Sequence, residues 1–381
     1  MRILLFISLY LAIYGGMHYY LYRSLRRGFA LTGRWHIALV VFLVLMILGP
    51  LSTRGLETIE WHAAAEGWAV LVFGWMGLLV MSITLFFFID IGRYLYRLLY
   101  FVKRQKIAPE QLPWRALISA VFVISAGASV YGYFAAKEIR IELVTISTDK
   151  LPAGITSYRM VQLTDVHLGV MTDAVWLERI VNEVNGLKPD LIVTTGDIID
   201  SRIGSAAPYQ QTLAKLQAPD GKYGVAGNHE FFAGIDKSVA FMEEAGFVML
   251  RGSSAKATPW LHLHGVDDRE GRHSGVKVED HEAPLMQAAE QQVFNLVLKH
   301  QPVIRDESVG RFDLQLAGHV HQGQIFPFRL ATWIAYPVAM GMSELGKGSS
   351  IYVSRGTGTW GPPMRVMAPP EITLFEFLPM R

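Results

Sequence analysis

Residues 158–167 read YRMVQLTDVH, a short apolar run that ends in an aspartate and, two residues later, a histidine. The run from Tyr158 to Leu163 has the length and apolar character of a buried strand, and Thr164-Asp165 marks its end. The same pattern, a short apolar run followed by a polar residue, recurs four more times along the chain. The closing residues of the five runs are Asp165 with His167, Asp197, Asn228-His229, His300, and His319 with His321.

From about residue 140 onward such runs alternate with helical patterns, which favours an α/β unit. Apolar residues at helical spacing predict helices over 173–187, 208–217 and 236–245. In open α/β sheets, ligands bind beyond the carboxyl ends of the strands, so we expect the five polar ends to meet at one edge of one sheet. Strands are predicted over 158–163, 190–195, 222–226, 248–250, 260–266, 294–298, 314–317, 350–354 and 371–377.

Residues of these types suit a pair of metal ions. Hydrolysis of a phosphate ester requires that the anionic oxygens around phosphorus be neutralised and the leaving oxygen stabilised, and two ions about 3.5–4 Å apart do both. Holding two ions takes imidazoles, carboxylates and at least one shared ligand. A mixed set of nitrogen and oxygen ligands suits Mn, Fe, Zn or Co better than Mg or Ca. The sequence therefore predicts two divalent ions, whose identity among these four stays open.

The motifs D-x-H, G-D, G-N-H-E, H and G-H-x-H, in this order, resemble the calcineurin-like metallophosphoesterases over roughly residues 157–377. The chain is similar to membrane-associated bacterial members of that family. The resemblance implies two central β-sheets flanked by helices, with a dinuclear metal centre. It also implies that His229 stands by the leaving group as the general acid. Finally, it implies seven metal ligands, with Asp197 bridging: Asp165, His167 and His321 on the first ion, and Asn228, His300 and His319 on the second.

Four further features allow two interpretations each. Arg365 ends a loop rich in glycine and proline, and it either clamps a phosphate or has a structural role. Asp268 follows a predicted strand and either hydrogen-bonds a ligand imidazole or the substrate, or closes a turn. Glu230 is as readily a solvent-exposed acid as a catalytic group. Residues 325–343 are unusually apolar and form either core or an apolar lid or rim that faces lipid.

The N-terminal third is typical of a membrane region. Half of the whole chain is hydrophobic, and four apolar stretches approach or exceed the roughly 20 residues that a helix needs to cross a bilayer. We therefore expect an all-α transmembrane region of about four helices over 1–140, followed by an α/β (α+β) catalytic domain over 141–381. The apolar stretches are about 3–22, 35–51, 67–91 and 114–134.

The charge distribution predicts an orientation. Residues 1–140 hold 14 Lys and Arg against six Asp and Glu, whereas 141–381 hold 21 against 27. Residues 23–34 and 92–115 carry most of the early basic residues, and the positive-inside rule places both loops in the cytoplasm. The catalytic domain then lies on the outer face of the cytoplasmic membrane. Its acidic balance makes nucleic acid an unlikely partner, and nothing indicates an oligomeric state.

Together these features predict a membrane-anchored, metal-dependent phosphoesterase that acts on a lipid-linked or membrane-proximal phosphate. One alternative is a phosphatase or phosphodiesterase for a soluble nucleotide or phosphomonoester. A second, from another class, is a non-catalytic metal-binding membrane scaffold, which would tolerate missing ligands, but the series of expected ligands is complete. The absence of cysteine excludes thiolate metal sites and cysteine nucleophiles.

Overall fold

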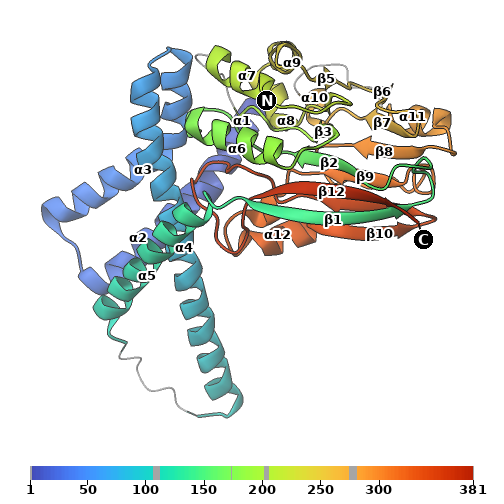
Figure 1. Ribbon diagram of the computed structural model, residues 1–381. Coiled ribbons are helices and arrows are strands. Elements are labelled where there is room, and N and C mark those ends of the chain that lie inside the picture. The colour runs from blue at the N-terminus through green and yellow to red at the C-terminus, as the bar shows by residue number, and fades with distance from the viewer. Residues whose placement is uncertain (1, 106–111, 173, 201–205, 274–280, 381) are drawn as a thin grey trace. The chain divides into compact units, whose positions relative to one another are not determined.

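The computed structural model describes residues 2–105, 112–172, 174–200, 206–273 and 281–380. The chain divides into two compact units. The first comprises Met1–Phe134 with Gly361–Met364 and is helical, and the second comprises Ala135–Trp360 with Arg365–Arg381 and contains both sheets. We call them the helical unit and the catalytic unit. Figure 1 labels the helices and strands of both.

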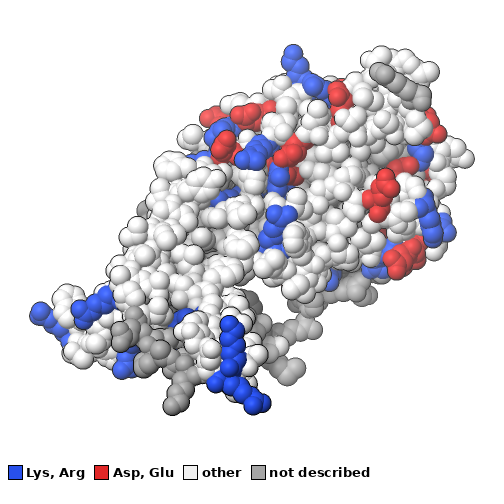
Figure 2. All heavy atoms as spheres, turned by 90° about the horizontal axis from the view of Figure 1, so that it is seen from below, with Lys and Arg blue, Asp and Glu red and all other residues white. Residues whose placement is uncertain are grey.

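Three helices of the helical unit are long and apolar enough to cross a membrane, among the residues that the structure describes. Their surfaces carry many exposed large apolar side chains, and Figure 2 shows one face of the molecule on which wide areas bear no charged residue. Apolar surface of this extent needs a bilayer around it, since water would make its exposure costly. The three helices are α3 (Gly33–Thr58), α4 (His62–Val102) and α5 (Trp114–Ala135).

The predicted first span, residues 3–22, is not one long α-helix, so three candidate spans replace the four that the sequence predicted. It is divided into α1 (Arg2–Tyr10), a π-helical segment η1 (Leu11–Gly15) and α2 (Gly16–Phe29). The wider π turn interrupts the α-helical hydrogen bonding, but residues 2–29 stay helical throughout, and this run is not among the three candidate spans. The shortest predicted stretch, 35–51, lies instead within the 26-residue α3.

One acid in the helical unit is fully paired. The Asp90 carboxylate on α4 accepts hydrogen bonds from Tyr20 Oη at 2.7 Å and from Arg93 Nη1 at 2.7 Å, and Arg27 Nη1 lies 3.3 Å away. An intramembrane acid is a functional candidate by default, but one that is neutralised by two arginines holds helices together without further purpose. Asp90 therefore gives no support to a transport function.

The catalytic unit is built on two six-stranded sheets. The first sheet has the order β1-β12-β2-β3-β4-β5, and β2 to β5 run parallel to one another. The second sheet has the order β10-β11-β9-β8-β7-β6, and β7, β8, β9 and β11 run parallel. The first sheet comprises β1 (Arg140–Thr148), β2 (Tyr158–Leu163), β3 (Leu191–Thr194), β4 (Lys222–Gly224), β5 (Val248–Met249) and β12 (Glu371–Pro379). The second comprises β6 (Ser253–Lys256), β7 (Leu261–Gly265), β8 (Phe294–Leu298), β9 (Leu314–Ala317), β10 (Gly341–Gly346) and β11 (Ser349–Val353).

The two sheets pack face to face and helices cover the outside, as the resemblance implies. Met160, Leu296 and Phe377 belong to one apolar core, which places side chains of β2, β8 and β12 between the sheets. On the outer face of the first sheet, α6, α7 and α9 form a second core with β2 and β3 (Figure 1). The helices of this unit are α6 (Ala174–Gly186), α7 (Ala206–Ala214), α8 (Asn228–Ala233), α9 (Ile235–Glu244), α10 (Glu270–His273), α11 (Glu282–Ala288) and α12 (Phe328–Ala335).

Two expectations from the sequence need correction. The five polar strand ends do not share one sheet, because β2, β3 and β4 belong to the first sheet and β8 and β9 to the second. Short apolar runs look alike in either layer, so periodicity does not assign a strand to a sheet. The core interpretation of residues 325–343 is wrong for α12, none of whose residues is buried: Trp333 is 53% exposed and Ile334 88%. Residue 173 of the predicted helix 173–187 lies outside the described residues.

Candidate metal centre

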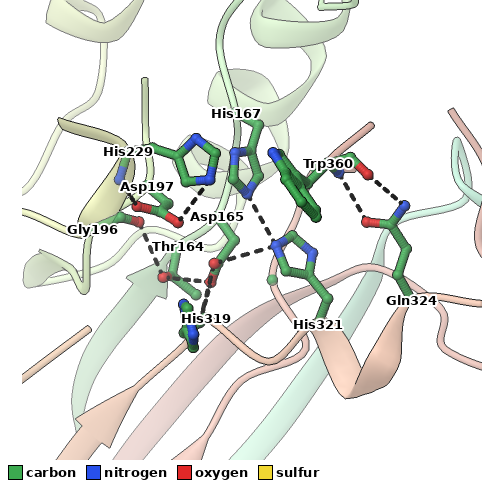
Figure 3. Close-up of polar contacts among 12 residues, drawn as sticks. Thr164, Asp165, His167, Gly196, Asp197, His229, His319, His321, Gln324 and Trp360 are labelled. Atoms are coloured by element: carbon green, nitrogen blue, oxygen red, sulfur yellow. Dashed lines mark hydrogen bonds and ion pairs between the residues drawn. The ribbon is translucent and has the colours of Figure 1, made fainter. Parts of the chain in front are cut away.

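The polar residues at the five strand ends lie together where the carboxyl edges of the two sheets meet. Figure 3 shows six of them, among which Asp165, His167 and His321 face one another. The chain supplies them from loops that leave parallel strands, so their side chains converge without any long connection. The segments after β2, β3 and β4 place Asp165 and His167, Asp197, and Asn228 and His229, whereas those after β8 and β9 place His300, His319 and His321.

Five of these residues adopt the left-handed backbone region. The φ angles are 54° at Asp165, 54° at His167, 52° at Asp197, 71° at His319 and 46° at His321. Such a conformation costs a residue with a Cβ on the order of 1 kcal/mol or more, and it persists only where the surroundings enforce it. Here it turns each chain sharply off its strand and aims the side chain at a common centre. Strain gathered on predicted ligands is typical of a functional site.

Two glycines make room for the carboxylates. A Cβ at Gly227 would lie 2.2 Å from Asp197 Oδ1 and 2.8 Å from His300 Nδ1. A Cβ at Gly318 would lie 2.2 Å from Asp165 Oδ2. These glycines therefore do more than form turns, because any other residue would push an aspartate out of the centre.

A first group of donors consists of Asp165, His167 and His321, all buried. The Nε2 atoms of His167 and His321 are 3.0 Å apart, and His321 Nε2 is 3.4 Å from Asp165 Oδ1. Burial alone would raise the pKa of Asp165, but the nearby histidines lower it well below its usual range. Burial lowers the pKa of His321 to about 4. At neutral pH Asp165 is therefore an anion and His321 a neutral imidazole, which are the forms that bind a cation.

A second group consists of Asp197, His300 and His319. His300 Nε2 lies 3.0 Å from Asp197 Oδ2, 3.0 Å from Asn228 Oδ1 and 3.1 Å from His319 Nδ1. Its Nδ1 lies 2.9 Å from the backbone oxygen of Thr195, a contact that fixes the ring with Nε2 toward the centre. Burial lowers the pKa of His319 to about 3. Asn228 completes this group with a neutral oxygen.

Asp197 connects the groups. It belongs both to the set with His300 and His319 and to a further set with His167 and His229. Burial opposes its charge, yet His300 and His229 lower its pKa well below the usual range. A carboxylate has two oxygens with free lone pairs and can serve a cation on each side. The donor set of aspartates, histidines and one asparagine fits two divalent ions that accept nitrogen and oxygen.

His229 stands at the edge of this cluster with its ring oriented by an acid. His229 Nδ1 is 2.9 Å from Asp200 Oδ1, and Nε2 lies on the other side of the ring, 4.0 Å from Asp197 Oδ2. Burial would lower the pKa of His229, but the charges of Asp197 and Asp200 outweigh it and raise the pKa to about 9. Asp200 therefore holds the ring by Nδ1, and Nε2 points toward Asp197.

Asp200 was not among the site residues predicted from the sequence. Its Oδ1 also lies 3.4 Å from His167 Nδ1, so a single partly exposed carboxylate contacts one predicted ligand and the predicted acid. The available signal was an acid three residues beyond Asp197, in the segment G-D-I-I-D. Burial would raise the pKa of Asp200, but its histidine partners hold it well below the usual range.

We expect Asp200→Asn to lower kcat by about 10- to 100-fold, as the loss of an orienting partner does. The amide keeps the shape of the side chain but lacks the charge that holds the proton on His229. Steady-state hydrolysis with metal content measured in parallel checks this. Asp190→Asn is the matched control, because that carboxylate accepts a hydrogen bond from the Arg159 backbone instead. Wild-type kcat in Asp200→Asn would remove the orienting role.

Glu230 is not a solvent-exposed acid. It is buried, and its carboxylate accepts hydrogen bonds from the backbone N–H groups of Gly227 at 2.7 Å, Asp197 at 2.9 Å and Ile199 at 2.9 Å. It stands at the third position of α8 and reaches back to the start of that helix, as an acid in a capping box does. Glu230 thereby ties the loop that carries Asn228 and His229 to the loop that carries Asp197.

Asp268 and Arg365, the two predicted substrate contacts, are both buried. Asp268 accepts hydrogen bonds from Gln301 Nε2 at 3.0 Å and from the backbone of Glu270. Arg365 is only 1% exposed. Its guanidinium donates to the backbone oxygens of Gly356, Gly358 and Ala368, and its Nη2 lies 3.1 Å from His321 Nδ1. This placement suits an arginine that supports His321, and contact of either residue with substrate stays a prediction.

Arg365→Lys separates these roles. A lysine amine cannot reproduce the planar set of donors, so we expect the affinity for Mn²⁺ to fall about 10- to 100-fold. Isothermal titration with Mn²⁺ measures it. Arg355→Lys is the control, because Arg355 pairs with Glu142 and Glu371 and should keep wild-type affinity. A raised KM with unchanged Mn²⁺ affinity would instead identify Arg365 as a phosphate clamp.

Comparisons with known proteins identify a family for the chain. Residues 158–323 match the model of the calcineurin-like phosphoesterase family. An uncharacterized metallophosphoesterase of Aquifex aeolicus is 35% identical over 245 residues, which are 64% of this chain and 94% of that protein. A transmembrane protein with metallophosphoesterase domain from Danio rerio is 30% identical over 357 residues, 89% of this chain and 79% of that protein. The crystal structure of a dimetal phosphatase from Danio rerio is similar at a TM-score of 0.37 and 15% identity, over 53% of this chain and 88% of that one.

Proposed function

Because the chain belongs to the calcineurin-like metallophosphoesterase family, we propose that it is a membrane-anchored enzyme that hydrolyses a lipid-linked or membrane-proximal phosphate ester. As a family member it is a metal-dependent phosphoester hydrolase. The observation that carries the proposal is the convergence of the Asp165 and Asp197 groups of donors on one buried centre, with His229 held by Asp200 beside it.

The metal ligands follow from the two groups. Asp165, His167 and His321 would hold one divalent ion, and Asn228, His300 and His319 would hold the other. Asp197 would serve both ions, because it belongs to one donor set with His167 and to another with His300 and His319. When bound, the two ions neutralise the phosphate oxygens and activate the attacking water. The ligand set suits Mn, Zn, Fe or Co, and we propose Mn²⁺ as the first ion to test.

His229 supplies the proton that the departing alcohol needs. Asp200 holds the proton on Nδ1, so the proton on Nε2 faces the centre and is the one transferred to the leaving oxygen. A group of this kind contributes about 10²- to 10⁴-fold to a rate. Water then restores the proton to His229 after the alcohol departs.

The lipid-linked substrate is supported by how the chain is anchored and by what the catalytic unit exposes. The last candidate span ends at Ala135, and the catalytic unit begins there. Within that unit, α12 follows the ligand His321 by only a few residues and exposes Trp333 and Ile334. Tyr336, at the end of α12, lies with its ring 5.9 Å from that of His319. Apolar surface so close to a metal centre suits a substrate that is itself partly apolar.

A substrate panel tests the proposal. The purified full chain, loaded with Mn²⁺ in mixed micelles, is offered a phosphatidic acid, a prenyl phosphate, a nucleoside monophosphate and glycerol phosphate. We expect kcat/KM for one of the two lipid phosphates to exceed that for both soluble esters by at least about tenfold, since burial of each CH₂ adds to binding. The same chain treated with chelator is the control. Equal or better hydrolysis of the soluble esters would contradict the lipid-linked substrate. If none of the four esters is hydrolysed, the result favours the non-catalytic scaffold instead.

We propose that the catalytic unit lies on the outer face of the cytoplasmic membrane. The basic segment 92–115 precedes α5, and the positive-inside rule keeps that segment in the cytoplasm. One crossing by α5 then delivers Ala135 to the opposite side. This orientation depends on α5 alone. It therefore stays the same with three candidate spans in place of the predicted four. Protease added to intact spheroplasts should digest the catalytic unit. Full protection of that unit from the protease would instead place it in the cytoplasm.

A further inference from the structure

Two aromatic rings stand at the outer edge of His229 with much of their surface in solvent. Phe232 is 60% exposed and Trp360 is 55% exposed. Their rings meet that of His229 nearly edge-on, with centroids 5.6 Å and 5.9 Å away and interplanar angles of 75° and 73°. Aromatic side chains of this size are usually mostly buried, so a pair of them exposed beside a proton donor calls for an explanation.

Both rings are held firmly. Phe232 belongs to α8, the helix that begins at Asn228 and is tied to the Asp197 loop by Glu230. The backbone of Trp360 is fixed at both polar groups, because its N–H donates to Gln324 Oε1 at 2.8 Å and its carbonyl accepts from Gln324 Nε2 at 3.0 Å. Figure 3 shows these two bonds and the Trp360 ring beside the histidines. The backbone positions that carry the two rings are therefore held in place beside His229.

The position of the two rings beside His229 indicates a role in binding the leaving group of the ester. Asp197, Asp200 and His167 occupy the inner surroundings of His229, and Phe232 and Trp360 stand on its outer side. If Nε2 protonates the leaving oxygen, the carbon group attached to that oxygen must lie next to His229 and hence against these rings. Resting on the proposed function, we propose that Phe232 and Trp360 form the binding site for the alcohol portion of the ester and select an apolar chain over a polar one.

Binding of inert phosphonates tests this without any hydrolysis. In hexylphosphonate and methylphosphonate the carbon is attached directly to phosphorus, so both occupy the site and neither is cleaved. The Mn²⁺-loaded full chain in nanodiscs is titrated with each. We expect hexylphosphonate to bind at least about tenfold tighter, because five additional CH₂ groups leave water. Phe232→Ala and Trp360→Ala should each reduce this preference by about fivefold or more, with the Kd for methylphosphonate unchanged within about twofold.

The controls separate the outcomes. Val175→Ala removes an apolar side chain, 75% exposed, from α6 and should keep the wild-type preference, since α6 carries none of the predicted site residues. Metal content is measured in every variant, and the two rings lie on different elements, so a fold defect in one leaves the other informative. A wild-type chain without preference, or variants that weaken both phosphonates equally, would overturn the aromatic site. A protein that binds hexylphosphonate selectively but hydrolyses no ester would refute the enzyme and leave this inference standing.

Discussion

Asp197→Ala is expected to lose both metal ions and to hydrolyse phosphate esters at least about 100-fold more slowly than the wild type. Loss of a group that only orients a ligand already costs about 10- to 100-fold in metal affinity or activity, and Asp197 is a member of donor sets on both sides of the centre. Its removal also leaves the His229 backbone N–H without its acceptor. Metal content by mass spectrometry after dialysis, with kcat/KM in excess Mn²⁺, gives both results.

Asp268→Ala is the matched control for this substitution. It removes another buried carboxylate near His300, but one whose hydrogen bonds come from Gln301 and Glu270. We expect it to retain two ions per chain. A full pair of ions in Asp197→Ala would refute the bridging role, whatever the activity of that variant.

His229→Ala is expected to keep both ions and to lower kcat by about 10²- to 10⁴-fold, the range for a positioned general acid. The deficit should depend on the alcohol. An ester with an acidic leaving group, such as a nitrophenol, departs without a proton and should lose much less rate than an alkyl ester. Parallel kcat measurements on a nitrophenyl and an alkyl phosphate reveal this difference.

His262→Ala provides the comparison for a buried histidine outside the centre, on β7 of the second sheet. It should leave both rates unchanged. Equal losses on the two esters in His229→Ala would show that the histidine orients the phosphate or a ligand and is not the acid. Loss of metal in the same variant would make it a ligand.

Much of the catalytic unit was predictable from the sequence. The strands that carry the centre are short apolar runs with clear polar ends, and the runs at 158–163, 294–298 and 314–317 coincide with β2, β8 and β9. These apolar runs do not show which strands pair with one another in a sheet. β1 and β6 were not predicted, because an edge strand such as β1 alternates exposed and half-buried residues and carries charges that read as loop.

The centre was predictable to the extent that residue type determines it. The eight predicted site residues do lie together, since carboxyl ends of parallel strands meet at one edge in each layer. Asp200 and Glu230 were missed or misjudged because their roles depend on which histidine or backbone N–H lies opposite. The left-handed turns at Asp165 and His321 are also unreadable, since neither residue is glycine.

The exposure of side chains was the least predictable property. The sequence left residues 325–343 open between core and an apolar lid or rim, and it does not distinguish Phe232 and Trp360 from buried aromatic residues, because only the packing decides their exposure. The number of spans was misjudged for a related reason. A π turn at Leu11–Gly15 changes no residue type, yet it interrupts a helix that composition alone makes continuous.

Titration of metal-depleted protein with Mn²⁺, followed by the rate of phosphate ester hydrolysis, tests the two-ion centre most directly. The two groups of donors that Asp197 connects predict that the rate of hydrolysis rises until two ions are bound per chain and then stays constant. They also predict no hydrolysis above background before metal is added. Full activity at one ion per chain, or in the presence of chelator, would contradict the dinuclear centre.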